Sequence, residues 1–303
     1  MKKQLLTVML CGALLTGCDT ASVPHTNGSG TSAGSFVEQP TVARVDLDDF
    51  IIGGCTSLSL AGNLAAAKAG DTSYETACDK TAFSGNSEAA WQNLLDGKLD
   101  VVFAYVPSAE IKQKLDEQGI SLIEVGTDAL VFLAGTNPKA YQTPVWTKQN
   151  ILAAYEKDNT SAWIGYAAAS GSDSRELFAT VFGTDASGVT IQSGEDTLTA
   201  ACPHTAGTLC YTTWLSLLQN GKPDNTKIAD IDGILPTETQ EGISYPFTVS
   251  YYVAVRSDLE NNDPAMLFYR WICSDAGQEW LSEATVPQTA EETDESNDMT
   301  QAS

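Results

Sequence analysis

The chain has 303 residues, of which 43% are hydrophobic, so it is long enough for about two domains of roughly 150 residues, each with its own core. Acidic residues number 39 against 16 basic ones, which gives a net charge of -23. This balance argues against nucleic-acid binding, because a phosphate backbone needs a basic surface. It does not exclude a small anionic ligand, since a buried pocket can hold an anion through backbone amides and hydroxyls.

Residues 1-17 are typical of an export signal. Lys2 and Lys3 precede an apolar run that is too short to span a bilayer as a permanent helix. The run ends at Leu15-Thr16-Gly17-Cys18, which resembles the lipobox of bacterial lipoproteins. We therefore expect Cys18 to be lipidated as the first mature residue and to anchor the protein on the extracytoplasmic face of the cell membrane. A secretory peptide with an accidental cysteine is the alternative.

The two ends of the mature chain lack core-forming patterns. Residues 18-41 are rich in Ser, Thr, Gly and Pro and predict a flexible tether. Residues 289-303 are acidic and polar and predict a disordered tail. Between them, short apolar runs alternate with amphipathic stretches, which favours an α/β fold whose sheets are covered on both faces.

The alternation gives a series of expected elements in the first half of the chain. They are a strand at 45-52, a helix at 58-69, a helix at 88-95, a strand at 99-104, a helix at 109-117 and apolar segments at 120-125 and 129-134. A glycine loop with Thr56 and Ser57 precedes the first helix, and Ser84-Gly85-Asn86-Ser87 precedes the second. Each loop places small polar residues at a helix N-terminus.

A third loop of this kind, Ser170-Gly171-Ser172, runs into a helical pattern. Gly171 lets the backbone approach a ligand closely, and the serines offer hydroxyls beside the unpaired amides of a helix N-terminus. Such a loop can hold an anion. The alternative is that Ser172 or Asp173 only caps the helix.

The cysteines permit disulfides in an oxidising compartment. Once Cys11 and Cys18 are set aside, five remain, and an odd number leaves at least one free or paired outside the chain; they are Cys55, Cys78, Cys202, Cys210 and Cys273. Cys202 and Cys210 are the local pair, closing a short loop. Cys55 with Cys78 is an open second pairing, because both are expected at the carboxyl ends of neighbouring strands. The spacings predict no zinc or other metal site.

A series of short motifs spans residues 42-287: Gly54-Cys55-Thr56-Ser57, Asn86-Ser87, Asn93 to Asp100, Pro107-Ser108, Asp128 to Pro138, Gln149 to Tyr155, Ser170-Gly171-Ser172, Ile231 to Thr237, Tyr245-Pro246-Phe247 and Ala276-Gly277-Gln278. In this order they resemble the phosphate-binding lipoproteins of ABC-type phosphate transporters. The resemblance implies a two-domain, periplasmic-binding-protein-like fold of type II with two crossover hinge strands.

The resemblance also implies a domain division and a ligand site. Residues 42-134 would form the first part of domain I, residues 135-244 domain II, and residues 245-288 the hinge return and the rest of domain I. Asp128–Ala134 and Tyr245–Arg256 would be the hinge strands. The three loops would surround one ligand, with candidate binding residues Thr56, Ser57, Ser87, Ser170, Gly171, Ser172 and Arg175.

The chain departs from the family at two charged positions. Tyr166 stands where the family has an arginine, and Tyr105 or Val106 stands in the place of its acidic residue. A tyrosine cannot replace the forked, charge-assisted bonds of arginine to phosphate, so binding should be weakened or redirected. Arg175 can supply charge to the cleft, or it can form a salt bridge on the helix surface with Asp173 or a neighbouring residue.

The resemblance therefore implies a solute-binding lipoprotein that delivers phosphate or a similar small oxyanion to ABC permease subunits. The alternative is a binding-protein-like receptor or interaction lipoprotein that has lost phosphate binding. We expect no cofactor and no enzymatic activity, because only two histidines exist, His25 and His204, and His25 lies in the tether.

Overall fold

The computed structural model describes residues 44-136, 144-156, 161-186, 190-191, 207-236 and 245-285. Several predictions from the sequence lie outside these residues: the export signal, the lipidation of Cys18, the tether, the acidic tail and the Cys202 partner of Cys210.

The first described segment is a packed loop rather than the strand expected at 45-52. Only Ile52–Gly54 form a strand, β1, while Val45, Leu47 and Phe50 are buried one by one against the core. The Asp49 N–H donates to the carbonyl of Asp46 in a turn. The acidic residues between the apolar ones favour this turn, so the alternating pattern reflects loop packing and not strand pairing.

The next elements include the expected ones in their order. They are the 3-10 helix η1 (Thr56–Leu58), α1 (Ser59–Gly70), α2 (Tyr74–Lys80), β2 (Ala82–Phe83), α3 (Ser87–Leu95), β3 (Val101–Tyr105) and α4 (Ala109–Glu117). Among them, η1, α2 and β2 were not predicted from the sequence. The helices expected at 58-69, 88-95 and 109-117 are confirmed. Asn86 and Ser108 cap α3 and α4 by accepting hydrogen bonds from backbone amides, as short polar residues before a helix commonly do.

A single long strand, β4 (Ile123–Gly135), replaces the two apolar segments expected at 120-125 and 129-134. Its register shifts between Glu124 and Gly126, where a side chain on residue 126 would meet the hydroxyl of Tyr251 at 2.3 Å. The bulge thus lets the strand pass Tyr251 and continue.

The second half of the described chain alternates again between strands and helices. Its elements are α5 (Lys148–Ala154), β5 (Ile164–Ala167), α6 (Asp173–Phe182), β6 (Thr190–Ile191), β7 (Thr208–Thr213), α8 (Trp214–Asn220), β8 (Thr226–Ile228), β9 (Thr248–Val255), α9 (Pro264–Ile272) and α10 (Asp275–Ala284).

The strands form one connected sheet in the order β2-β1-β3-β9-β4-β7-β5-β6, with β8 also paired to β4. β1 is parallel to β2 and β3, and β5 is parallel to β6 and β7, whereas β4 and β9 are antiparallel. β4 pairs with β9 along its first part and with β7 and β8 along its second. β4 contains one segment expected as a hinge strand, Asp128–Ala134, and β9 lies within the other, Tyr245–Arg256; the hinge role and the domain boundaries stay predictions.

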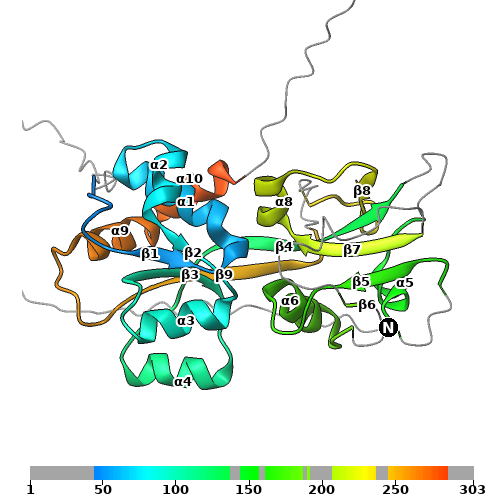
Figure 1. Ribbon diagram of the computed structural model, residues 1–303, viewed down its shortest axis with the longest axis horizontal. Coiled ribbons are helices and arrows are strands. Elements are labelled where there is room, and N and C mark those ends of the chain that lie inside the picture. Colours follow the sequence, from blue (N-terminus) through cyan, green and yellow to red (C-terminus); the bar gives the residue numbers. More distant parts are fainter. Residues whose placement is uncertain are drawn as a thin grey trace, which may run out of the picture. The chain divides into compact units, whose positions relative to one another are not determined.

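Helices cover both faces of the sheet, as expected for an α/β fold. Figure 1 shows α1, α2 and α10 on one face of β1, β3 and β9, and α3 and α4 on the other. In the second half, the ring of Phe132 on β4 packs against aromatic rings from α6, β7 and the segment before β9, namely Phe178, Phe182, Tyr211 and Phe247. These rings anchor α6, and therefore the loop that precedes it.

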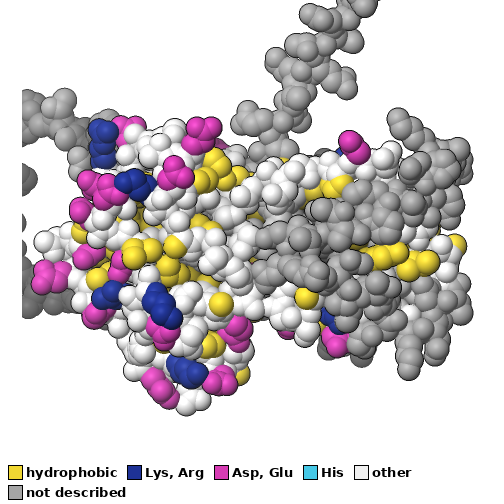
Figure 2. Space-filling view, viewed as in Figure 1, with side chains coloured by type: hydrophobic (Ala, Val, Ile, Leu, Met, Phe, Trp, Pro, Cys, Tyr) yellow, Lys and Arg dark blue, Asp and Glu magenta, His cyan; other side chains and the backbone are white. Residues whose placement is uncertain are grey.

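The described surface carries both signs of charge. On the face seen in Figure 2, the described Lys and Arg side chains are interspersed with Asp and Glu and form no continuous basic patch. None of the helices in the described part of the chain is both long and apolar enough to cross a membrane.

Candidate functional site

The first loop comes directly after β1 and is bonded to its neighbours. A side chain at Gly54 would meet the carbonyl oxygen of Phe103 at 2.1 Å, so only glycine allows β1 and β3 to approach this closely. The Cys55 N–H donates to the same Phe103 carbonyl at 3.2 Å, and the Thr56 N–H donates to the Gly85 carbonyl at 3.0 Å. The Thr56 amide, a candidate ligand donor, is therefore used to hold the second loop.

The second loop leads into α3, and its residues contact both the third loop and the end of β3. The Asn86 Nδ2 donates to the carbonyl of Gly171 at 2.6 Å, which joins the second and third loops. The Ser87 hydroxyl accepts the backbone N–H of Tyr105 at 3.0 Å. Ser87 is buried, so its hydroxyl serves the end of β3.

The third loop caps α6. Gly171 has φ of 81°, a left-handed conformation that glycine adopts without strain. The Ser172 hydroxyl accepts the Arg175 N–H at 3.3 Å and donates to the Ala169 carbonyl at 2.8 Å. The capping role, given above as the alternative for Ser172, is thus present in the structure. Ser170 is exposed.

Arg175 is buried but is directed to the protein's own atoms. Its Nη1 donates to the Ala168 carbonyl at 3.1 Å, and its Nη2 lies 4.0 Å from the Asp185 carboxylate. It also contacts the hydroxyl of Tyr211, whose pKa is raised to about 12 because burial outweighs the nearby guanidinium. Among the described residues, the ion pair of Arg175 is thus with Asp185 and not with Asp173. Tyr166, on β5, packs against the hydrophobic core.

Asp173 occupies the position between the second and third loops. Its Oδ1 accepts the backbone N–H of Ser87 at 2.8 Å, and the residue is only 5% exposed. It is the first residue of α6 and reaches the N-terminus of α3, where helix dipoles stabilise negative charge. The sequence singled out Asp173 only as a cap or salt-bridge partner, because a contact across 86 positions leaves no local signal.

A second buried carboxylate, Asp128, lies on β4. Its Oδ2 accepts the Tyr105 hydroxyl at 2.6 Å, and its Oδ1 accepts the N–H groups of Ala129 at 2.7 Å and Leu215 at 3.1 Å. Burial raises the pKa of Asp128 to about 6, against the lowering effect of these donors. The Tyr105 hydroxyl is thus bonded to a buried acid on the neighbouring part of the sheet, Asp128.

Cys55 of the first loop lies next to Ser87 and Asp173. The suggested disulfide between Cys55 and Cys78 is absent. Both are free thiols; Cys55 contacts Ser87 and Asp173, whereas Cys78 lies beside Tyr74. The suggestion was wrong because Cys78 belongs to helix α2 and not to the end of a strand. Burial, with the charge of Asp173 added, raises the pKa of the Cys55 thiol well above its usual value. Cys55 is thus an unreactive packing residue.

A pocket of about 380 Å³ lies beside the second and third loops. Of the seven candidate ligand residues, Ser87 and Gly171 line it, whereas Thr56, Ser57, Ser170, Ser172 and Arg175 do not. Three carboxylate side chains line it as well, those of Glu88, Asp173 and Glu176, and no Lys or Arg is among the described residues of its wall. The second and third loops thus meet at an acidic pocket, whereas the first loop does not line it.

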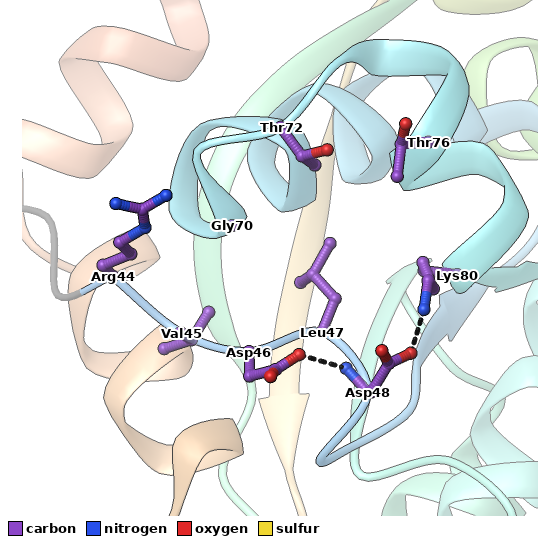
Figure 3. Close-up of a pocket in the computed structure, with 9 residues that line it drawn as sticks. All are labelled: Arg44, Val45, Asp46, Leu47, Asp48, Gly70, Thr72, Thr76 and Lys80. Atoms are coloured by element: carbon purple, nitrogen blue, oxygen red, sulfur yellow. Dashed lines mark hydrogen bonds and ion pairs between the residues drawn. The ribbon is translucent and has the colours of Figure 1, made fainter.

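Another pocket lies away from the loops, between the segment at 44-48 and the turn from α1 to α2 (Figure 3). Figure 3 shows Lys80 bonded to Asp48 across its rim, while Arg44 points outward. Arg44 and its partner Asp71 are both more than two-thirds exposed, so this ion pair adds little stability. None of the candidate ligand residues lines this recess. Across the described ranges, no group of His, Cys, Asp and Glu could hold a metal ion.

Neither protein-family models nor curated protein sequences give a match to this chain. Solved structures do resemble it. A protein described as a phosphate ABC transporter substrate-binding protein with bound phosphate, from Clostridium perfringens, has a TM-score of 0.59 and 18% identity over 79% of this chain and 98% of its own. An ABC-type phosphate transport receptor from Vibrio cholerae has a TM-score of 0.54 and 14% identity, covering 78% and 98%.

A third structure, described as a periplasmic metal-binding protein, has a TM-score of 0.53 and 15% identity over 77% of this chain and 90% of its own. All three are described as binding proteins or a transport receptor. At these identities the likeness concerns the fold alone. It confirms the mixed α/β fold of the type II periplasmic-binding-protein kind.

Proposed function

We propose that the protein is a lipid-anchored receptor or interaction protein of the extracytoplasmic face that keeps the fold of a solute-binding protein but does not carry free phosphate. The observation that carries this proposal is the hydrogen bond from the Ser87 amide to Asp173. An oxyanion at the meeting of the loops would need that amide, and a carboxylate of the chain already takes it.

The other candidate ligand groups support the same proposal. The Thr56 amide, the Ser172 hydroxyl and the Arg175 guanidinium are engaged with backbone groups of the protein. The adjoining pocket adds Glu88 and Glu176, whose charges repel an anion. Phosphate would therefore meet negative charge without a compensating arginine in the described part of the pocket wall.

A second candidate function is delivery of phosphate or a similar small oxyanion to ABC permease subunits. It is favoured by one observation: the three loops do converge, and the group between them is itself an anion. In this account the Asp173 side chain would move away from the Ser87 amide when an oxyanion binds there.

Calorimetric titration of the mature chain separates the two candidates. We expect no saturable heat with inorganic phosphate, sulfate or molybdate at millimolar concentration. Saturable binding of any of these anions by the wild-type protein would favour the carrier and contradict the receptor proposal.

The membrane anchor is tested separately. The segment that resembles a lipobox ends at Cys18, so attachment should depend on this cysteine. We expect Cys18→Ala to move the protein from the membrane fraction to the soluble fraction of disrupted cells. Retention of the variant in washed membranes would refute lipidation at this cysteine.

A further inference from the structure

We propose that the Asp173 carboxylate is a built-in occupant of a latent oxyanion site, and that this one side chain decides that inorganic phosphate and sulfate do not bind. The inference rests on the function proposed above and names the residue responsible for it. It predicts that an anion can bind at the Ser87 amide once the carboxylate is removed.

The position of the carboxylate is that of a ligand. It lies at the N-termini of two helices, α6, which it begins, and α3, whose first N–H it accepts at 2.8 Å. It also contacts Cys55 from the first loop. Asp173 therefore meets the first and second loops from its own place in the third, which is where a bound anion would have to lie.

The surroundings explain why the carboxylate keeps other anions out. A phosphate in hydrogen-bond reach of the Ser87 amide would lie next to the Asp173 charge in a buried place, where repulsion between like charges is strong. Arg175 cannot offset it without leaving the Ala168 carbonyl. Exclusion is thus a property of the side chain and not of the backbone of the loops.

The structure also offers an entry route. Asp173, Ser87 and Gly171 all line the pocket of about 380 Å³, so shortening residue 173 would connect the freed amide with this pocket. Glu176 provides a matched control, because it is a second acidic residue of α6 that lines the same pocket but is exposed.

The experiment compares wild type, Asp173→Ala and Glu176→Ala in thermal unfolding with increasing inorganic phosphate, sulfate or chloride, followed by calorimetry. Phosphate and sulfate stabilise folded proteins in general, so the informative quantity is the difference between the variants. We expect Asp173→Ala to unfold at a lower temperature than wild type in chloride, and to regain several degrees saturably with phosphate or sulfate. Its affinity for phosphate should exceed that of wild type at least about tenfold.

The outcomes are distinguishable. If wild type itself binds phosphate as tightly as Asp173→Ala does, both this inference and the receptor proposal fail. If neither protein binds phosphate, the inference fails and the receptor proposal stands. Should Asp173→Ala not fold, Asp173→Ser takes its place, because its short side chain removes the charge and also the Oδ1 that holds the Ser87 amide. It should then bind phosphate more tightly than Glu176→Ala, and equal affinities would overturn the inference.

Discussion

Asp128 and Asp173 are both buried carboxylates that accept backbone amides near a helix N-terminus, yet they differ in what surrounds them. Asp128 accepts hydrogen bonds from Tyr105, Ala129 and Leu215, among others, and does not line the pocket beside the loops. Asp173 accepts the Ser87 amide and also lines that pocket. The comparison indicates that a carboxylate enclosed by the chain is a structural part, whereas one at a pocket wall takes the place of a ligand.

The largest effect is expected from Asp128→Ala. The substitution leaves these buried donors without their acceptor, and it should lower the free energy of unfolding by about 4 kcal/mol. Urea unfolding measures the loss. Phosphate should not restore it, because the pocket beside the loops does not reach this carboxylate. Restoration equal to that of Asp173→Ala would remove the difference between the two residues.

The pH dependence of stability gives the second largest effect. The folded-state pKa of Asp128 is about 6, above its ordinary value of 3.8, so the folded protein keeps a proton that the unfolded chain releases. The stabilisation is complete below the ordinary value and is lost as the pH rises through 6, by at most about 3 kcal/mol.

The matched variant for this pH dependence is Asp128→Asn, which has the same shape and does not titrate. The difference in unfolding free energy between wild type and Asp128→Asn should therefore fall steadily from pH 4 to pH 7. A difference that stays constant over this range would show that Asp128 does not titrate as described. Exposed carboxylates with lowered pKa, such as Asp258, act equally in both proteins.

Removal of one donor from Asp128 should have a smaller effect. Tyr105→Phe deletes the hydroxyl that lies 2.6 Å from Oδ2, and a hydrogen bond to a charged group contributes about 2 kcal/mol. The loss should be greatest above pH 6, where Asp128 is ionised, and should diminish at pH 4. Equal losses at both pH values would argue that the hydroxyl serves packing alone.

The smallest effect is expected in the third loop. Ser172→Ala removes the cap of α6 and should cost about 1 kcal/mol, whereas Ser170→Ala, at an exposed position, should change stability by less than about 0.5 kcal/mol. Urea unfolding of both variants tests this order. If Ser170→Ala were the more damaging, the assignment of Ser172 as the cap would be wrong.

Local signals in the sequence were sufficient for much of the fold. Helices α3 and α4 are predicted by a capping residue and amphipathic spacing, and the α/β alternation is predicted by the apolar runs. The strand expected at 45-52 was wrong because alternating burial also arises in a packed loop. The pairing of Cys55 with Cys78 was wrong because α2 lies where the end of a strand was expected.

The candidate site was only partly predictable. The glycine and serine loops indicated where helix N-termini meet, and the structure brings them together. The occupant could not be predicted, because Asp173 and Ser87 are 86 positions apart and their contact depends on the whole sheet. Asp128 did leave a signal, since it is a single acid at the start of the apolar run from Ala129 to Ala134, and such a residue needs buried partners.

The most direct test of the central claim is the amide resonance of Ser87 in nuclear magnetic resonance spectra, recorded while inorganic phosphate is added. The account predicts that the resonance stays in place in wild type, because the Asp173 carboxylate holds this N–H, and that it moves saturably in Asp173→Ala. A saturable shift of the Ser87 amide in the wild-type protein would show that phosphate reaches it, and would contradict the claim that Asp173 occupies the site.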